Sequence, residues 1–241
     1  MSKLQRVVSL VYPDQCALCP EIVDHVGGLC VSCWAKTSFL TGLVCDLCGC
    51  SLLGEGDEAE ALCDDCLSTP RPWRKGRAAI SYQNAGRRFI LALKHGDRTD
   101  LAKPAAKWML QRGHECLKPD TVLVPIPVHW SRLLRRRYNQ AAELARAIGQ
   151  VTGNHVINDA LVRTRRTSPQ DGLTVEERYE NLVDAFAVNP KRRQDLKDRH
   201  ICLVDDVMTS GATLATAAKT ALASGAGQLS VLVLARVEKS P

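Results

Sequence analysis

Four Cys-x-x-Cys pairs lie within the first 66 residues, and their repeated spacing limits what this part of the chain can fold into. The pairs are Cys16/Cys19, Cys30/Cys33, Cys45/Cys48 and Cys63/Cys66. A Cys-x-x-Cys turn places two thiolates about one tetrahedral edge apart, so two turns supply the four sulfur ligands of a structural zinc ion. The eight cysteines therefore predict two zinc sites of four cysteines each.

Two features of the zinc sites stay open at the level of sequence. Consecutive pairs can share an ion, or the pairs can interleave; both schemes fit the spacing, and we favour the consecutive one. Cys50 lies two residues after Cys48 and could replace a ligand, although a spare thiol is the favoured interpretation. A disulfide framework would need an oxidising compartment, for which the chain carries no recognisable signal, so zinc is favoured.

Charge divides the chain at the same place as cysteine. Residues 1–70 contain three Lys or Arg and ten Asp or Glu, a net charge of −7, and nine of the eleven cysteines. Residues 71–241 contain 29 basic and 16 acidic residues, a net charge of +13. We therefore predict two domains, a double zinc-ribbon head at 1–70 and a basic body at 71–241, and expect the body to meet phosphates.

Composition narrows the class of protein further. A hydrophobic content of 45% with 24% charged residues is typical of a chain that buries a core, which excludes global disorder. No apolar run approaches the roughly 18 residues needed to span a bilayer. The N-terminal segment lacks the apolar region and cleavage site of a secretory signal. We expect a cytoplasmic protein without a membrane span.

The body alternates between strand-like and helix-like segments. Short apolar runs predict strands at 78–82, 121–124, 201–204 and 229–235. Segments with helical periodicity lie at 85–94, 101–110, 139–151 and 213–224. Strands separated by crossover helices are typical of an α/β fold, with a parallel sheet covered by helices on both faces.

The segment 204–213 reads Val-Asp-Asp-Val-Met-Thr-Ser-Gly-Ala-Thr and predicts a ligand site. A strand carries Asp205 and Asp206 at its carboxyl end, and a loop of small residues then opens a helix. Amides at a helix N-terminus form an anion site, and Gly211 lets the backbone approach a phosphate closely. The two carboxylates suit vicinal hydroxyls or a hydrated Mg²⁺. The combination predicts a ribose 5-phosphate, and the alternative is an ordinary strand-to-helix turn with a capping acid.

This segment resembles the signature of the type I phosphoribosyltransferases, whose ligand is phosphoribosyl pyrophosphate (PRPP). The resemblance implies that Asp205 and Asp206 form the catalytic pair, which holds the ribose 2- and 3-hydroxyls. It also implies five residues that cradle the 5-phosphate: Thr209, Ser210, Gly211, Ala212 and Thr213.

The order of motifs along nearly the whole chain is similar to that of the ComF/GntX family. The motifs are the four cysteine pairs, Leu93-Lys94, Val124-Pro125-Ile126-Pro127-Val128-His129, Arg132, Asn139-Gln140 and Asp205-Asp206. The resemblance implies a zinc-ribbon head on a type I phosphoribosyltransferase-like domain, and a role in the use of external DNA. One departure is Arg137, which stands where the family usually has glycine and which makes a positive φ less favourable.

Further PRPP contacts are expected from three other segments. The loop after 121–124 should emerge at the same sheet edge as the aspartates. Its predicted ligand residues are Arg132, Arg136, Asn139 and Gln140. Arginine suits a pyrophosphate because its guanidinium is bidentate, whereas a solvated face is the alternative for an arginine run.

Lys94 is expected to reach a phosphate, although a lysine at a helix end also complements the helix dipole. A polar, basic stretch from 163 resembles the family's mobile loop, which closes over the substrate, and it supplies Arg163 and Gln170. Solvated surface is the competing interpretation for both residues.

These features favour a ComF-like protein that binds PRPP and Mg²⁺ and acts in DNA uptake or utilisation. Whether it is an enzyme stays open, because no residue identifies an acceptor. The alternatives are an active phosphoribosyltransferase of nucleotide metabolism, a PRPP sensor without turnover, and a handler of single-stranded DNA. A DNA-processing protein is a further candidate partner, at the zinc head.

Overall fold

The computed structural model describes residues 13–25, 27–54, 61–95, 98–165, 167 and 174–238. Its centre is a four-stranded sheet in the order β1 (Lys75–Ser81), β6 (Gln228–Arg236), β5 (His200–Met208) and β2 (Val122–Pro125). All three pairings are parallel. The strands carry almost continuous buried residues, as expected for a sheet that is covered on both faces.

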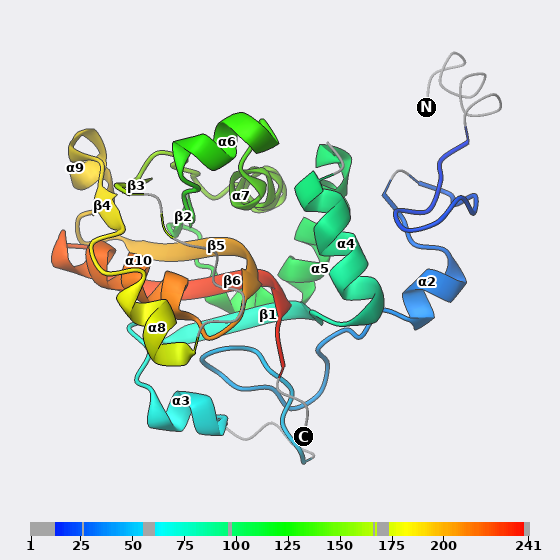
Figure 1. Ribbon diagram of the computed structural model, residues 1–241, viewed down its shortest axis with the longest axis horizontal. Helices are drawn as coiled ribbons and strands as arrows, with labels where there is room; N and C mark the ends of the chain where they lie inside the picture. The colour runs from blue at the N-terminus through cyan, green and yellow to red at the C-terminus, as the bar shows by residue number, and fades with distance from the viewer. Residues whose placement is uncertain are drawn as a thin grey trace.

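Helices cover both faces of this sheet (Figure 1). On one face lie α4 (Asn84–His95), α5 (Ala102–Gly113) and α7 (Gln140–Thr152). On the other lies α10 (Ala212–Ala223), beside α8 (Val175–Glu180) and the antiparallel pair β3 (Leu161–Arg163) and β4 (Phe186–Val188). In β5, Cys202 and Val204 face the first group, whereas Ile201 and Leu203 face the second. The predicted α/β class with a parallel sheet is confirmed.

The predicted strands and helices of the body agree with the structure, apart from their ends. β5 extends to Met208 because Val207 and Met208 continue the ladder with Ala235 and Arg236 of β6. Asp205 and Asp206 therefore lie within the last half of the strand and not after it. Shorter elements complete the fold: α2 (Val31–Ala35), α3 (Asp64–Ser68), α6 (Trp130–Arg136) and α9 (Arg193–Leu196), with 3₁₀ turns η1 (Thr99–Leu101), η2 (His114–Cys116) and η3 (Pro190–Arg192).

The cysteine-rich part, residues 13–70, forms backbone hydrogen bonds with the β1 edge of the sheet. The amide of Leu40 donates to the carbonyl of Ala79 at 3.0 Å, and the amide of Ser81 donates to the carbonyl of Ser38 at 2.8 Å. These bonds cover an edge that would otherwise present unpaired backbone groups. The division at residue 70 stays a prediction.

Each half of the cysteine-rich part packs against a different face of the sheet. Leu29 and Phe39 join the core formed with α4 and α5. Cys45, Cys48 and Cys66 join the core formed with α10. Figure 1 shows α2 beside α4, and α3 on the side of α8. In the described part of the chain, no helix is both long and apolar enough to cross a membrane.

Candidate functional site

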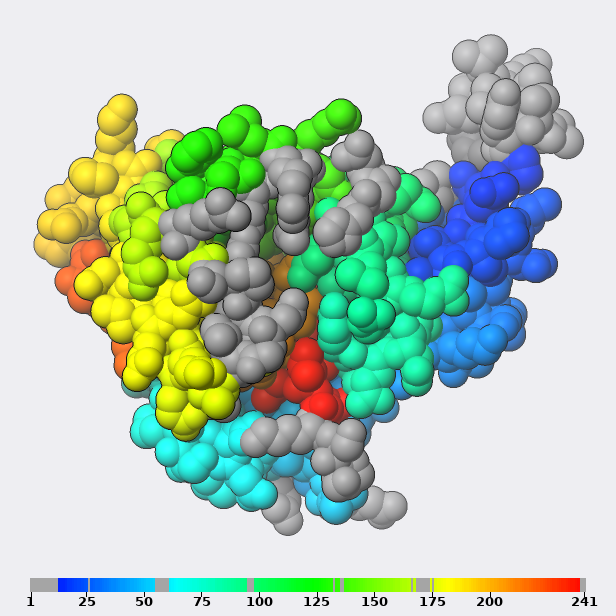
Figure 2. Space-filling view, in the orientation of Figure 1, coloured from blue at the N-terminus to red at the C-terminus, as the bar shows by residue number. Residues whose placement is uncertain are grey.

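A cavity of about 260 Å³ opens where β2 and β5 end at their carboxyl ends. This is the edge at which parallel α/β sheets bind their ligands. Figure 2 shows the orange surface of β5 in a hollow between α4 and α8. Nine predicted site residues border the cavity: Lys94, Asn139, Gln140, Arg163, Asp205, Asp206, Thr209, Gly211 and Thr213.

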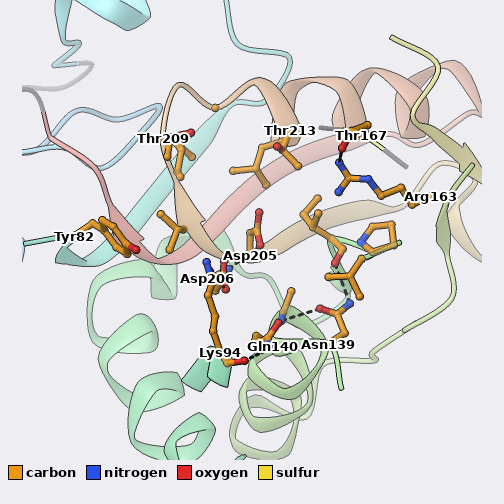
Figure 3. Close-up of a pocket in the computed structure, with 18 residues that line it drawn as sticks. Tyr82, Lys94, Asn139, Gln140, Arg163, Thr167, Asp205, Asp206, Thr209 and Thr213 are labelled. Carbon is orange, nitrogen blue, oxygen red and sulfur yellow. Dashed lines mark hydrogen bonds and ion pairs between the residues drawn. The ribbon is translucent and has the colours of Figure 1, made fainter. Parts of the chain in front are cut away.

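The acidic pair lies at the centre of the cavity, beside a lysine (Figure 3). Asp206 is buried, and its carboxylate lies 3.2 Å from the ammonium of Lys94. Asp205 accepts a hydrogen bond of 2.8 Å from the amide of Asp206. Loss of solvation, together with the charge of Asp206, raises the pKa of Asp205 to about 8. Near neutral pH the pair therefore carries a proton that a ligand or a cation can displace.

The loop between β5 and α10 presents unbonded amides. Gly211 adopts a φ of +82° and caps α10, a conformation that favours glycine. The backbone N–H groups of Thr209, Ser210 and Gly211 have no hydrogen-bond acceptor within the described ranges. Three consecutive free donors at the N-terminus of a twelve-residue helix form a site for an anion.

Two predicted phosphate ligands contribute differently. Ser210 and Ala212 belong to this loop, but neither side chain borders the cavity. Ala212 is 1% exposed and packs in the core, and the Ser210 hydroxyl accepts a hydrogen bond from the Ala212 amide at 3.4 Å. Ser210 therefore shapes the start of α10.

Asn139 and Gln140 border the cavity but also organise its walls. The Asn139 side chain caps α7 by accepting from the amide of Ala141, and its Nδ2 donates to the Ile126 carbonyl at 3.0 Å. Gln140 is 2% exposed, and its Nε2 lies 3.5 Å from the Lys94 carbonyl. The motif predicted ligand contacts at these positions; the observed contacts join the loop after β2 and the end of α4 to α7.

Arg163 supplies positive charge to the opposite wall. Its Nη2 donates to the Thr167 hydroxyl at 2.5 Å, and its guanidinium lies 5.2 Å from the centre of the Phe186 ring. Figure 3 shows Arg163 and Lys94 on either side of the acidic pair. Both cations therefore border the cavity, Lys94 paired with Asp206 and Arg163 bonded to Thr167.

The side chains of three predicted ligand residues lie outside the part of the chain that the structure describes. Gln170 falls in the interval 168–173, and α6 contains Arg132 and Arg136, whose side chains are not described. Arg137 ends α6 with a φ of +66°. An arginine thus adopts the left-handed conformation for which a glycine was expected, at a strain of about 1–2 kcal/mol.

Sequence reasoning missed Tyr82 and Thr167, which also border the cavity. Tyr82 directly follows β1, and its amide donates to the carbonyl of Arg236 at 2.7 Å. Its position just after a parallel strand was a usable signal, because all such strands end at the same edge. Arg71 and Arg236, which lie behind the β5–α10 loop, were missed as well.

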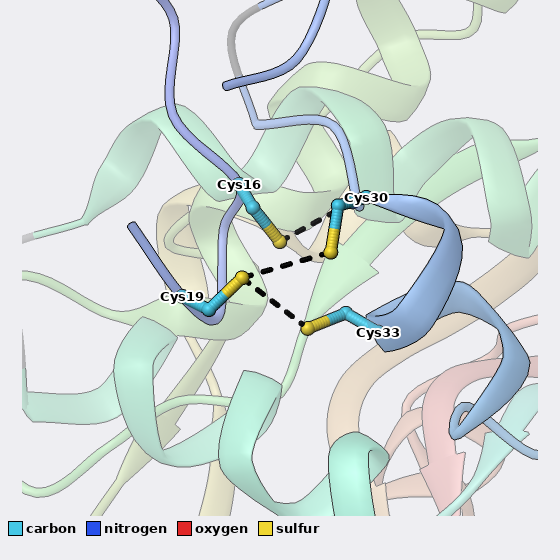
Figure 4. A group of neighbouring side chains, drawn as sticks. All are labelled: Cys16, Cys19, Cys30 and Cys33. Carbon is cyan, nitrogen blue, oxygen red and sulfur yellow. Dashed lines mark hydrogen bonds between the residues drawn. The ribbon is translucent and has the colours of Figure 1, made fainter. Parts of the chain in front are cut away.

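The eight paired cysteines form two clusters. In each cluster four sulfurs lie within 4.8 Å of one another, and the members are Cys16, Cys19, Cys30 and Cys33 (Figure 4), then Cys45, Cys48, Cys63 and Cys66. Consecutive pairing is therefore the observed arrangement. Cys50 is in neither group of four, but its side chain hydrogen-bonds with Cys45, Cys48 and Cys63 of the second.

The geometry of both clusters fits zinc. Sulfur-to-sulfur distances are 3.6 Å for Cys19 and Cys30, and 3.6 Å for Cys48 and Cys63. Four Zn–S bonds of about 2.3 Å in a tetrahedron place sulfurs about 3.8 Å apart. The amide of Cys30 also donates to the Cys16 sulfur at 3.3 Å, which stabilises a thiolate. The chain therefore has two structural zinc sites.

Known proteins resemble both parts of the chain. Residues 7–73 match the double zinc ribbon domain. Over 235 residues the chain is 28% identical to DNA utilization protein YhgH of Escherichia coli strain K12, covering 94% of this chain and 99% of that protein. Competence protein F of Haemophilus influenzae is 26% identical over 87% of this chain and 90% of its own length. Competence protein ComFC of Bacillus subtilis is 26% identical over 82% and 79%.

These similarities extend through the cysteine clusters and the parallel sheet alike, and the paired zinc sites are those that the matched domain describes. The double zinc ribbon and the relatives named for DNA utilization and competence support a ComF family member.

Proposed function

We propose that the cavity binds PRPP together with Mg²⁺, and that this ligand serves a role in DNA uptake or utilisation. The observation that carries the proposal is the position of an acidic pair, and of Thr209 and Gly211 with their free amides, in the walls of one cavity. A ribose 5-phosphate needs both, because its diol donates hydrogen bonds and its phosphate accepts them.

The 5-phosphate would bind the loop between β5 and α10. The amides of Thr209, Ser210 and Gly211 supply its donors, and the positive end of α10 favours its charge. Asp205 and Asp206 would accept the ribose hydroxyls. Deprotonation of Asp205, whose pKa of about 8 holds a proton at neutral pH, completes that pair of acceptors.

The pyrophosphate would lie toward Lys94 and Arg163. Carboxylate oxygens are ligands that Mg²⁺ prefers, so Asp205 and Asp206 suit a hydrated ion that the pyrophosphate also binds. When bound, Mg²⁺ neutralises the charge of the pyrophosphate. Lys94 and Arg163 add positive charge from two different elements, and they orient the group relative to the sugar.

Relatives named for DNA utilization or competence support the DNA-related role. Single-stranded DNA is a second candidate ligand because α6 exposes an aromatic side chain within an arginine-rich segment: Trp130 is 65% exposed. An exposed indole offers a base-stacking surface, and a net charge of +13 over residues 71–241 favours phosphates. We expect the protein to act in the cytoplasm, where its thiols stay reduced.

Calorimetric titration with PRPP, with and without Mg²⁺, tests the proposal. We expect saturable binding that weakens when EDTA replaces Mg²⁺, and weaker binding of ribose 5-phosphate. Absence of heat at millimolar PRPP would contradict the assignment. A pyrophosphate-release assay with each nucleobase then distinguishes a transferase from a sensor, and strand binding by wild type and Trp130→Ala at several salt concentrations tests the DNA candidate.

A further inference from the structure

Arg71 connects the second zinc cluster to the loop between β5 and α10. Its Nη1 donates to the carbonyl of Ser210 at 2.8 Å and to the hydroxyl of Tyr179 on α8 at 3.2 Å. The Arg71 side chain also hydrogen-bonds to the sulfur of Cys66. The guanidinium therefore contacts a zinc ligand on one side and the loop backbone on the other.

Arg236 approaches the same loop from the end of β6. The residue is 4% exposed, and its Nη1 donates to the carbonyls of Met208, at 3.3 Å, and Thr209. Its Nη2 lies 4.0 Å from the carboxylate of Asp65 on α3, next to the zinc ligand Cys66. Both arginines thus join the second zinc ribbon to the β5–α10 loop.

Together the two guanidiniums bind three consecutive carbonyls, those of Met208, Thr209 and Ser210. Carbonyl and amide groups of a turn point in different directions. The arginines bind the carbonyls of this loop, so its amides stay free to bind a ligand. Within the described ranges, the amides of Thr209 and Ser210 have no acceptor. Arginine donors on one side and free amides on the other make the loop a preorganised anion site.

The local sequence Arg71-Pro72-Trp73 favours this arrangement. A residue before proline avoids the helical region, so no helix runs through Arg71 into Trp73. The guanidinium carbon of Arg71 lies 5.8 Å from the centre of the Trp73 ring, and the Trp73 indole donates to the carbonyl of Leu47 at 2.6 Å. The ring thereby fixes Arg71 against the second ribbon.

We infer that Arg71 and Arg236 are positioning residues, which orient the backbone of residues 208–210 for the 5-phosphate and make ligand binding depend on the second zinc ribbon. This inference rests on the proposed function, because the phosphate is the group that the amides would bind. Neither arginine borders the cavity itself, so both act through the loop.

The inference predicts a loss that is selective for ligands with a 5-phosphate. In the zinc-loaded protein, Arg71→Gln should bind ribose 5-phosphate and PRPP about 10-fold more weakly, the loss expected for one charge-assisted hydrogen bond. Arg71→Lys should restore part of the affinity. The affinity for inorganic pyrophosphate with Mg²⁺ should not change, because that ligand uses Lys94 and Arg163.

Arg77→Gln is the matched control. Arg77 is another buried arginine that joins the second ribbon to the sheet, through a 2.6 Å ion pair with Asp46, but it does not contact the loop. The Arg77→Gln variant should lower the melting temperature as Arg71→Gln does, but its affinity for ribose 5-phosphate should not change. Equal affinities in wild type, Arg71→Gln and Arg77→Gln would overturn the inference.

Hydrogen–deuterium exchange separates this inference from the proposed function. Arg71→Gln should speed exchange in peptides that cover 208–213, whereas Arg77→Gln should not. If wild type binds neither PRPP nor ribose 5-phosphate, the proposed function fails. Faster exchange of 208–213 in Arg71→Gln than in Arg77→Gln would still show that Arg71 positions the loop. If exchange in 208–213 is the same in both variants, Arg71 does not position the loop.

Discussion

Lys94 holds its ammonium 3.2 Å from the carboxylate of Asp206, and this ion pair joins the end of α4 to the central strand β5. The two side chains are 20% and 13% exposed, so solvent screens their attraction only partly. Asp205, beside this pair, has a raised pKa and shares the same cavity. The cavity therefore balances two carboxylates with Lys94, Arg163 and one proton before a ligand binds.

Lys94→Met should weaken both the fold and the ligand affinity. Removing the cation leaves Asp206 buried without this partner, at a loss of about 3–5 kcal/mol in the free energy of unfolding. PRPP affinity should fall about 10-fold, because one charge-assisted contact is lost. Urea unfolding and calorimetry measure the two effects. Lys94→Arg, which keeps the charge, is the control, and unchanged affinity in Lys94→Met would remove Lys94 from the site.

Asp205 should make stability depend on pH. Its pKa rises from an ordinary value of 3.8 to about 8 in the folded protein, so the folded state binds the proton more tightly than the unfolded state. This contribution to stability is complete below pH 3.8 and is lost as the pH rises through about 8. In the Asp205→Asn variant, stability should fall less between pH 3.8 and about 8 than in wild type. Denaturant unfolding from pH 5 to 8 measures the slopes, and parallel profiles in both proteins would contradict the shift.

Ligand binding should release the same proton. If PRPP with Mg²⁺ requires the carboxylate form of Asp205, its affinity should rise with pH up to about 8. Calorimetry at pH 7 in buffers of different ionisation enthalpy counts the protons released. The release should disappear in Asp205→Asn, and wild type that releases none would exclude a protonated Asp205.

Zinc removal should affect the two clusters unequally. Purified protein should contain two zinc ions per chain, and chelation should unfold residues 14–68. Cys48 is fully buried against the sheet core, whereas Cys19 is part-exposed on the first ribbon. Cys48→Ser should therefore lower the melting temperature more than Cys19→Ser. Metal analysis that finds far fewer than two zinc ions would contradict the site assignment.

Gly211→Ala should disturb the loop more than its backbone conformation alone explains. A Cβ at Gly211 would lie 2.9 Å from Nη1 of Arg71, in addition to the strain at a φ of +82°. Gly153 has a φ of +79° with nothing within 4 Å of the same position, so Gly153→Ala reports the strain alone, about 1–2 kcal/mol. Only Gly211→Ala should lose affinity for ribose 5-phosphate. If Gly211→Ala and Gly153→Ala lose the same stability, and Gly211→Ala keeps its affinity for ribose 5-phosphate, the Arg71 side chain moves aside without an energetic penalty.

Local sequence patterns predicted the two cysteine clusters and the position of the acidic pair. Cysteine spacing identified both clusters, and the apolar run before Asp205 placed the acidic pair at the end of a strand, which in the structure continues to Met208. The three-residue strands β3 and β4 were missed because so short a run cannot show alternation. Tyr82 was missed for a different reason, since it joins the cavity through strand order.

Strand order also explains the two missed arginines. Arg236 reaches the loop because β6 lies between β1 and β5, an arrangement that no local pattern specifies. Arg71 reaches it because the second ribbon folds back against α10. Asn139 and Gln140 show the converse: the motif placed them at the cavity, but it did not predict the hydrogen bonds that tie them to Ile126 and Lys94.

The most direct measurement compares PRPP binding by wild type and by the double variant Asp205→Ala, Asp206→Ala in Mg²⁺, with zinc content determined for both. The double variant should retain two zinc ions and lose detectable PRPP binding. Equal affinity in the two proteins would contradict the assignment of the acidic pair to the ribose, and with it the proposed ligand.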